Sequence, residues 1–372
     1  MKIALLGFGT VGSHFYELTQ EQKELTVATV LSRRPRPELA CVVTADFDEI
    51  VRDPSIDAVV EVMGGVEPAF SYLCAAMRAG KHVVTANKQL MCAHYEELLA
   101  LARENGVCLR CTAAAGGGIP WLTSLARAAR VDRIDAVEGI LNGTTNFMLS
   151  AMASRGADYG TVLREAQALG YAEADPTADV EGYDARRKLV LSANLAFGVS
   201  LREEDVPCVG ISRITAADIE KAKELGFTFK LIARAEKSGD AVAAYVCPTL
   251  FPVTAPEAHT DGTGNLVSLY ARRIGKQSFS GAGAGGFPTA YNVLADCMEI
   301  AAGGCGAYYT DRAEKCAVDN SAAPGRWFFR HRGEYLFFGD YTVEQAFAVL
   351  ESYRADDPDA LLARVAAPRK KK

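Results

Sequence analysis

The feature that most constrains the fold is a glycine turn near the start of the chain. Residues 2–6 form an apolar run, and residues 13–18 after the turn are typical of a helix. A strand, a glycine turn and a helix in this order form a dinucleotide-binding fingerprint, whose glycines let the backbone approach a pyrophosphate and let the helix pack on the strand. The sequence therefore predicts a Rossmann-type, doubly wound parallel sheet that binds a dinucleotide at Gly7, Phe8, Gly9, Thr10, Val11 and Gly12.

Strands and helices continue to alternate through residues 1–135, as expected for an α/β domain with a parallel sheet. One apolar strand run is closed by Gly64, and a later one contains Thr85 and ends shortly before Lys88. Ligands bind at the carboxyl ends of the strands in such sheets. We therefore predict that Gly64, Thr85 and Lys88 lie at the cofactor and substrate crevice.

The second predicted strand, residues 25–31, is followed by Arg33 and Arg34. An NAD-specific site would offer an acid there to the ribose hydroxyls, whereas guanidinium groups suit the 2′-phosphate of NADP. NADP is therefore the favoured cofactor, and NAD remains the alternative if the loop brings Asp46 or Asp48 to the ribose. A second alternative is that both arginines are solvated loop residues.

An acidic segment further along ends in a lysine on an apolar helix. At helical spacing Lys188 shares a stripe with Asp184, Leu191 and Leu195, so the lysine is predicted to point inward. A buried ammonium needs a partner, and Asp184 lies one turn earlier. The pattern favours a pocket for an amine-bearing small molecule with a proton donor beside it. The alternative is an exposed ion pair worth about 0.3–0.5 kcal/mol.

Three further loops are rich in glycine or in small polar residues. Residues 115–120 form a glycine turn before a helix, residues 142–146 offer amides and hydroxyls, and residues 280–290 form a second glycine-rich loop before an apolar helix. Two glycine-rich loops on either side of a charged pocket predict a cofactor clamped between domains. A plain capping role for Thr145 or Asn146 is the alternative for the polar loop.

Length and charge exclude several classes of protein. At 372 residues the chain is long enough for two domains. Its net charge of -6 is mild, so we expect no nucleic-acid partner. The apolar runs are too short to span a bilayer, and Met1 leads directly into the first strand. We therefore expect no membrane association, no signal peptide and a cytoplasmic location.

The cysteines and histidines show no pattern of a metal or catalytic centre. The ten cysteines are scattered, and a reducing cytoplasm would keep them as thiols. Cys108 and Cys111 have metal-like spacing without a second matching pair, so we expect a strand with two cysteines. The five histidines are dispersed as well.

Taken together, the motifs resemble those of the homoserine dehydrogenase family. They stand in family order across residues 1–303 as GFGTVG, VVEVMGG, KHVVTANK, GGGIP, LNGTTNFML, LGYAEADPTADVEGYDARRKL and GAGAGGFPTA. The long acidic motif is the most specific of them. The resemblance implies reversible, NAD(P)-dependent interconversion of L-aspartate 4-semialdehyde and L-homoserine, on the way to threonine, methionine and isoleucine.

The resemblance also implies roles for individual residues. Lys188 would be the general acid and base, and Lys88 would be a second catalytic lysine near the nicotinamide and the substrate. An ammonium at hydrogen-bond distance can protonate the alkoxide that hydride transfer creates. The implied substrate-binding residues are Glu173, Asp184, Asp179, Gly143, Thr144 and Tyr171. Gly170 and Gly285 would contact the cofactor, together with Arg33 or Arg34.

Members of this family often hold a sodium-type monovalent cation through main-chain carbonyls of the glycine turn. The matching residues here are Ala115, Gly117 and Ile119, but the family's usual glutamate three residues before this run is Thr112. Carbonyls alone bind a hard ion weakly. The loss of the carboxylate therefore weakens the expectation of a cation.

The resemblance divides the chain into domains. Residues 1–135, completed by a returning helix at about 287–303, would bind the cofactor, and residues 136–286 would form an α+β substrate-binding and dimerisation domain. We expect a homodimer from the family's habit. Residues 319–372 are too short for a complete threonine-sensing ACT module, so we expect a truncated appendage with a solvated tail at 368–372.

Two rival functions remain open at this stage. One is another Rossmann-type amino-acid dehydrogenase, such as one that acts on aspartate, which would not need a lysine on the Asp184 stripe. The other is a non-catalytic NADP sensor with a decayed pocket. The presence of Glu173, Asp184 and Lys188 favours the enzyme.

Overall fold

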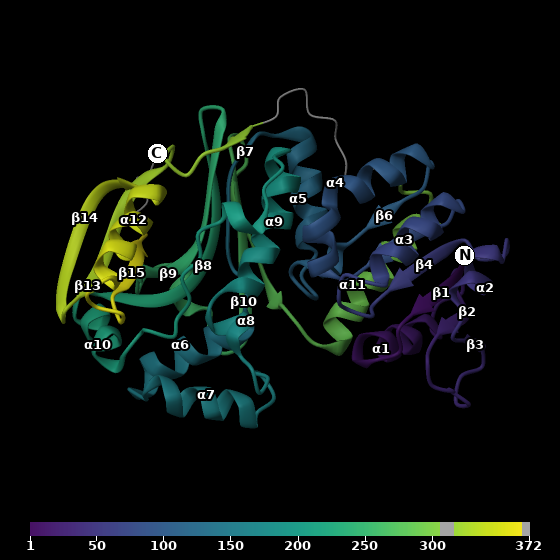
Figure 1. The fold of residues 1–372 in the computed structure, drawn as a ribbon, viewed down its shortest axis with the longest axis horizontal. Helices are drawn as coiled ribbons and strands as arrows, with labels where there is room; N and C mark the ends of the chain where they lie inside the picture. The colour runs from purple at the N-terminus through teal and green to yellow at the C-terminus, as the bar shows by residue number, and fades with distance from the viewer. Residues whose placement is uncertain (306–315, 367–372) are drawn as a thin grey trace. The chain divides into compact units, whose positions relative to one another are not determined.

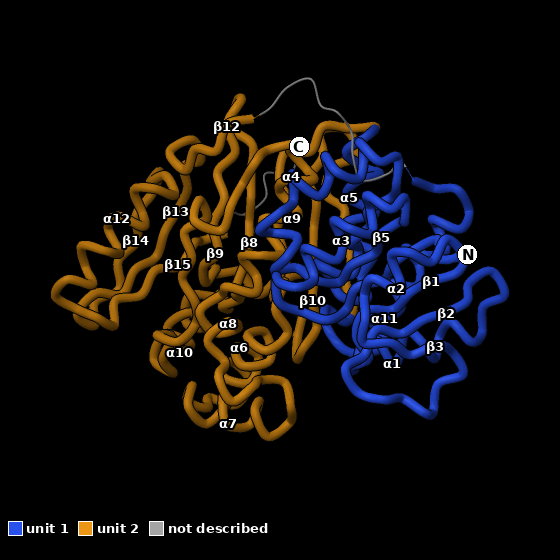
Figure 2. The backbone as a smooth tube through the Cα atoms, turned by 45° about the vertical axis from the view of Figure 1, so that its right-hand side comes forward, with its two compact units in different colours: residues 1–130, 282–311 blue, residues 131–281, 312–372 orange. Residues whose placement is uncertain are grey.

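A computed structural model describes residues 1–305 and 316–366, so the predicted tail at 368–372 lies outside the described residues. The chain divides into two compact units, which Figure 2 shows in different colours. Unit 1 comprises Met1–Arg130 and Ala282–Asp311, and unit 2 comprises Val131–Gly281 and Arg312–Lys372. Within the described stretches, no helix is both long enough and apolar enough to cross a membrane.

Unit 1 contains a six-stranded sheet in the order β3-β2-β1-β4-β5-β6, and its strand pairs are parallel. The strands are β1 (Lys2–Leu6), β2 (Thr26–Leu31), β3 (Val42–Thr44), β4 (Ala58–Glu61), β5 (His82–Thr85) and β6 (Leu109–Arg110). β1 and β4 are almost wholly buried, as expected for central strands covered on both faces. The predicted Rossmann-type sheet is confirmed.

Helices complete unit 1 (Figure 1). They are α1 (Thr10–Thr19), α2 (Phe47–Arg52), α3 (Ala69–Arg78), α4 (Lys88–Glu104), the short η1 (Thr112–Ala114), α5 (Trp121–Val131) and α11 (Gly286–Ala301). Helix α11, from the later part of the chain, packs beside α1, and Ala290 and Val293 share an apolar core with Ile3, Leu5 and Phe15. Residues late in the chain are therefore part of unit 1.

Unit 2 is built on a mixed nine-stranded sheet among the described residues, in the order β11-β10-β7-β8-β9-β15-β13-β14 with β12 beside β9. Its strands are β7 (Ile134–Ile140), β8 (Phe227–Ser238), β9 (Ala241–Pro252), β10 (Gly264–Ala271), β11 (Gly275–Ala282), β12 (Ala317–Val318), β13 (Pro324–His331), β14 (Glu334–Thr342) and β15 (Leu361–Val365). The predicted α+β class of this part is confirmed.

The helices of unit 2 carry the polar loops that the sequence singled out. They are α6 (Gly143–Arg155), α7 (Tyr159–Ala168), α8 (Thr177–Val180), α9 (Tyr183–Phe197), α10 (Ala216–Glu224) and α12 (Val343–Arg354), with short η2 (Glu203–Asp205) and η3 (Pro256–His259) turns. α9 is buried along most of its length, and it contacts β7, β8 and β9. This burial places Asp184 and Lys188 inside the unit.

The segment predicted as a C-terminal appendage extends the main sheet of unit 2. β15 pairs in parallel with β9 and antiparallel with β13, and α12 packs on β13, β14 and β15 (Figure 1). Trp327, Phe329, Leu350 and Leu362 lie in one buried cluster with Tyr245 of β9. The core of unit 2 therefore runs without a break from β9 into the C-terminal strands.

The expectation that all cysteines are thiols is wrong. Cys108 and Cys305 form a disulfide within unit 1, and the other eight cysteines are not joined in disulfides. Cys108 precedes β6, and its main-chain N–H donates to Nδ1 of His82. Because the two cysteines lie 197 residues apart, their spacing in the sequence gave no sign of this pair.

Candidate active site

A cavity of about 810 Å³ lies at the carboxyl ends of the strands of unit 1. Its lining includes Gly7, Gly9, Gly64 and the loop after β2. Gly9 is the N-cap of α1, so the N–H groups of the first helical turn lie beside the cavity and favour a phosphate group. A Cβ on Gly12 would lie 2.3 Å from the carbonyl oxygen of Gly7, so this close approach of α1 requires a glycine. The predicted glycine turn thus fits a dinucleotide.

Three arginines line the same cavity. Arg33 and Arg34, as predicted, lie in the exposed loop that follows β2. Arg36 was not predicted: its guanidinium lies over the ring of Phe8 at 5.1 Å from the ring centre and donates to the carbonyl oxygen of Phe8 at 3.2 Å. Three arginines within residues 33–36 were the sequence signal for this position. Their guanidinium groups suit this part of the cavity to an anionic group.

The two aspartates that would have offered a carboxylate to NAD are engaged in a nearby helix. Asp46 caps α2 and accepts from the main-chain N–H of Asp48 at 2.9 Å. Asp48 in turn pairs with Arg52 at 3.0 Å. Thr10 and Val11 lie in the first turn of α1, where Val11 packs against the apolar core.

A buried carboxylate organises the ends of β4 and β5. Glu61, which is fully buried, accepts from the N–H of Met63 at 2.7 Å and that of Gly64 at 3.3 Å. It also accepts from the hydroxyl of Thr85 at 2.6 Å. The sequence interpretation missed Glu61, although an acid inside the apolar run of residues 58–63 was the signal. The side chain of Thr85 therefore orients Glu61 and the loop at Gly64.

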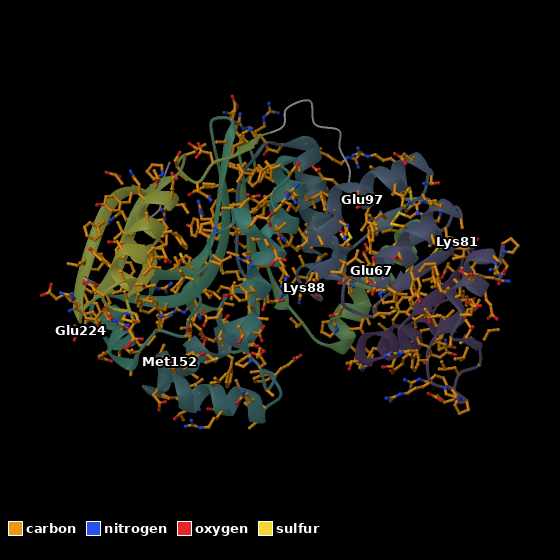
Figure 3. All side chains as sticks on the ribbon, in the orientation of Figure 1. Glu67, Lys81, Lys88, Glu97, Met152 and Glu224 are labelled. Atoms are coloured by element: carbon orange, nitrogen blue, oxygen red, sulfur yellow. A yellow bond between two sulfur atoms is a disulfide. The ribbon has the colours of Figure 1, made fainter. Side chains whose placement is uncertain are left out.

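Lys88 is the first residue of α4, shortly after the carboxyl end of β5, as the sequence predicted. Asn87 is the N-cap, and its side chain accepts from the N–H of Leu90 at 3.1 Å. The amide of Asn87 also donates to the carbonyl oxygen of Gly65 at 2.6 Å. Figure 3 labels Lys88, which is half-buried. The cap fixes the position of this lysine relative to the strand ends.

In unit 2 the predicted lysine and aspartate of α9 form a buried ion pair. The Nζ atom of Lys188 lies 2.7 Å from Oδ2 of Asp184, and the two side chains are 7% and 8% exposed. The same Nζ donates to the carbonyl oxygen of Leu141 at 2.7 Å, at the end of β7. The alternative of an exposed surface pair is therefore wrong, because both side chains are buried.

Asn142, the N-cap of α6, brings two carboxylates together. Its Nδ2 donates to Oδ1 of Asp179 at 2.7 Å and to Oδ2 of Asp184 at 3.0 Å. The hydroxyl of Thr144 lies 2.9 Å from Oδ2 of Asp179. Burial and the neighbouring Asp184 raise the pKa of Asp179, although the bonds from Asn142 and Thr144 oppose this shift. Asn142 was not among the predicted site residues, and its place as a cap after a strand was the available signal.

The other residues of unit 2 that the sequence predicted for the site are two exposed side chains and two glycines at helix ends. Glu173 is exposed, and its main-chain carbonyl accepts from the amide of Gln167 at 3.1 Å. The exposed ring of Tyr171 meets that of Phe147 edge-on, while its carbonyl oxygen lies 2.6 Å from the hydroxyl of Thr144. Gly143 begins α6, and Gly170 follows α7 with a positive φ. The structure thus brings together Asp179, Asp184 and Lys188 but leaves Glu173 outside their hydrogen bonds.

The three carbonyls predicted to hold a cation lie in the buried turn between η1 and α5, in unit 1. The amide of Asn292, on α11, donates to the carbonyl oxygens of Gly117 and Ile119. Gly285 is the N-cap of the same helix α11. The turn of Ala115, Gly117 and Ile119 is thereby joined to the helix that follows the second glycine-rich loop.

The chain is similar to proteins of one enzyme family along most of its length. Residues 120–298 match the family model described as homoserine dehydrogenase, and residues 7–111 match that of the homoserine dehydrogenase NAD-binding domain. The homoserine dehydrogenase of Bacillus subtilis is 42% identical over 314 residues, which cover 81% of this chain and 72% of that protein.

Solved structures agree with these sequence matches. A homoserine dehydrogenase from Thiobacillus denitrificans has a TM-score of 0.88 and 30% identity, with 98% of each chain covered. A hyperthermophilic archaeal homoserine dehydrogenase in complex with NADPH has a TM-score of 0.69, covering 80% of this chain and 96% of that one. At 24% identity the second likeness concerns the fold.

Proposed function

We propose how the active site works in this chain, which belongs to the homoserine dehydrogenase family and is an NAD(P)-dependent oxidoreductase acting on a CH–OH group. The enzyme interconverts L-aspartate 4-semialdehyde and L-homoserine. The observation that carries the proposal is the buried pair of Lys188 and Asp184, with its ammonium also bonded to the carbonyl of Leu141. Unit 2 would handle the substrate and the proton, and unit 1 would hold the cofactor.

The carboxylates of unit 2 would bind the α-ammonium group that both substrates carry. The amide of Asn142 donates to both Asp184 and Asp179, so it holds the two carboxylates close together without adding a charge. Two carboxylates and one ammonium leave a net negative charge, which favours a cationic ligand group. Glu173, whose side chain is exposed, would add a third carboxylate from the loop before α8. Gly143, Thr144 and Tyr171 would line the same pocket.

Lys188 would supply the proton when the aldehyde is reduced. The cofactor, when bound, supplies the hydride that reaches the aldehyde carbon. The carbonyl oxygen then gains negative charge, and the Nζ of Lys188 can donate a proton to it, which gives the alcohol. In the reverse direction the neutral amine of Lys188 accepts the hydroxyl proton. Asp184 would orient the ammonium and favour its charged form.

In unit 1 the cofactor's pyrophosphate would lie on the glycine turn of residues 7–12, at the start of α1. Arg33 and Arg34 support NADP over NAD, because they offer guanidinium groups to a 2′-phosphate and both nearby aspartates are engaged in α2. Lys88, at the start of α4, would lie near the nicotinamide and the substrate. Gly285 and Gly170 would contact the cofactor from their turns.

The experiment that tests this function follows NADPH absorbance with L-aspartate 4-semialdehyde as substrate. We expect turnover by the wild type and a loss of about 10²- to 10⁴-fold in kcat for Lys188→Ala, the usual contribution of a general acid. No turnover by the wild type with either NADPH or NADH would refute the function. Undiminished turnover by Lys188→Ala would refute only the role of Lys188.

A matched control separates loss of chemistry from loss of structure. Lys230 is also a buried lysine of unit 2, and its Nζ donates to the carbonyl oxygen of Thr260 at 2.6 Å. Lys230→Ala removes a buried ammonium without touching the carboxylates of the proposed substrate pocket. We expect its kcat to exceed that of Lys188→Ala by at least about tenfold, since no proton-transfer group is lost.

Two further properties are proposed from family membership. We expect a homodimer, which light scattering coupled to size-exclusion chromatography would measure as about twice the chain mass of 39.8 kDa. We also expect a cytoplasmic location. A single-chain mass in dilute solution would contradict the dimer.

A further inference from the structure

The glycine turn before α5 has main-chain carbonyls at the positions expected for a cation site, but a side-chain amide donates to two of them. Family resemblance places a monovalent cation at the carbonyl oxygens of Ala115, Gly117 and Ile119, all three of which are buried. The turn lies wholly in unit 1, beside α11. Its surroundings therefore decide whether a hard cation fits.

Asn292 occupies the position facing these carbonyls. Its side chain is buried, and its Nδ2 lies 2.5 Å from the oxygen of Gly117 and 3.0 Å from that of Ile119. The oxygen of Ile119 also accepts from the N–H of Trp121 at 2.7 Å. A carbonyl oxygen has two lone pairs, so both lone pairs of Ile119 are already used.

An amide nitrogen cannot take the place of a ligand to a cation. Its two hydrogens carry partial positive charge and point at the same oxygens that would coordinate the ion. A sodium-type ion, like other hard cations, needs several oxygen ligands around it. Asn292 would have to leave the turn before an ion could enter.

The carboxylate of the resembled site is also missing. At the matching position Thr112 donates its hydroxyl to Oδ1 of Asp296 at 2.6 Å and its N–H to Oδ2 at 2.8 Å. Both oxygens of Asp296 are thus engaged by Thr112 rather than directed to the turn. The donor set of this chain therefore does not fit a monovalent cation.

The Asn292 amide holds the turn against α11, as a bound ion would hold the carbonyls of the turn together. It joins the turn to α11, whose preceding loop packs on the same turn: the N–H of Gly118 donates to the carbonyl oxygen of Ala282 at 3.0 Å. A Cβ on Gly117 would lie 2.4 Å from the carbonyl carbon of Gly283, so the two glycine-rich loops are in direct contact.

We infer that the Asn292 amide replaces the monovalent cation in this chain, so that it folds and turns over without one. Asn292 is a positioning residue, since it acts by holding the two glycine-rich loops together. Cation binding to unit 1 can be measured without following the reaction catalysed.

The first test measures thermal unfolding of the wild type at fixed ionic strength. N-methylglucamine chloride is replaced stepwise by sodium or potassium chloride. A cation that binds only the folded state raises the unfolding midpoint as its concentration rises. We expect no saturable shift, and equilibrium dialysis should find no bound rubidium. A saturable rise in the midpoint, or one bound rubidium per chain, would overturn the inference.

The second test introduces the missing carboxylate with Asn292→Asp, which keeps the shape of the side chain. Two carbonyls and a carboxylate would then face one another, and this oxygen set recruits a cation. We expect the unfolding midpoint of this variant to rise with sodium, and its kcat without alkali cations to fall by about 10- to 100-fold and recover when sodium is added. If sodium changed neither the unfolding midpoint nor the kcat of Asn292→Asp, the result would contradict the inference.

Asn146→Asp is the matched control for this substitution. Asn146 is likewise buried and donates to carbonyl oxygens, those of Thr260, Gly262 and Gly264. The Nζ of Lys230 lies 3.1 Å from its Oδ1 and would balance a new carboxylate there. We expect no sodium dependence of its unfolding midpoint. A sodium response equal to that of Asn292→Asp would show a general effect of buried charge.

Discussion

Replacing Lys188 with methionine should destabilise unit 2 by about 3–4 kcal/mol. The substitution removes the 2.7 Å bond between Nζ and Asp184, whose side chain is 8% exposed and also accepts from the amide of Asn142. Breaking a buried pair by removing one partner typically costs about 3–5 kcal/mol. Asp184 can escape this cost only by taking up a proton. At about pH 7 protonating an aspartate of ordinary pKa, about 3.9, costs about 4 kcal/mol, which sets the upper limit.

Acidification should reverse this loss. Each pH unit brings protonation about 1.4 kcal/mol closer, so the folded variant gains a proton that the unfolded chain does not yet hold. The unfolding free energy of Lys188→Met should therefore rise relative to that of the wild type as the pH falls from about 7 to 5. Adding Asp184→Asn should recover most of the loss at neutral pH, because neither buried charge then remains.

The two tryptophans make the measurement specific to one unit. Trp327 is fully buried in unit 2, whereas Trp121 lies in unit 1. In a Trp121→Phe background, urea unfolding followed by fluorescence therefore reports on the unit that contains Lys188. Lys230→Met is the control: its carboxylate neighbour, Asp261, is 75% exposed, so no charge is left buried.

The prediction for Lys188→Met has a clear refutation. A loss below about 1 kcal/mol would match an exposed ion pair and contradict the inferred burial. The same conclusion would follow if the loss did not depend on pH, or if Asp184→Asn failed to recover stability. A loss for Lys230→Met equal to that for Lys188→Met would show that any buried lysine gives the effect.

Three other predictions concern the cofactor, the substrate pocket and the cysteines. Arg33→Ala together with Arg34→Ala should raise the KM for NADPH by about tenfold or more, since each charge-assisted bond contributes about 1.5–3 kcal/mol, and should leave the KM for NADH almost unchanged. Because the pKa of Asp179 is raised, its negative charge is lost at a higher pH than that of an ordinary aspartate; kcat/KM for homoserine should fall correspondingly early on acidification, and Asp179→Asn should lack this step. Alkylation of the denatured protein should modify eight cysteines without reductant and ten with it, and a peptide map should link Cys108 to Cys305. Equal KM changes for both cofactors, an identical acid limb in Asp179→Asn, or ten alkylated cysteines without reductant would each contradict the corresponding prediction.

The sequence could predict those features that depend on neighbours along the chain. The strands of unit 1 are apolar runs closed by turn residues, so their alternation with helices predicted the parallel sheet. Lys188 and Asp184 lie four residues apart on one helix, and helical spacing alone predicted their pairing, observed at 2.7 Å. The burial of that helix was also predictable, because the lysine shares its stripe with leucines.

Contacts between distant segments were beyond the same reasoning. Asn142 is separated from Asp179 by 37 residues and from Asp184 by 42, so no local pattern joins them. Asn292 reaches Gly117 across 175 residues. The resemblance named the carbonyls of the turn but could not show that a side chain from α11 donates to them. Such contacts depend on how the elements pack.

Both units use neutral amides where several acceptors converge. Asn142 holds two carboxylates, Asn146 holds three main-chain carbonyls, and Asn292 holds two. An amide offers two hydrogens in a fixed plane without a charge, so it costs less to bury than an ammonium. If Asn142 were a lysine, two ammonium groups would balance the charges of Asp179 and Asp184. The proposed substrate pocket would then no longer attract an α-ammonium group. Because the bridging amide is neutral, it does not replace Lys188 as the ion-pair partner of Asp184, and the proposed proton transfer requires the Nζ of Lys188 to keep this place.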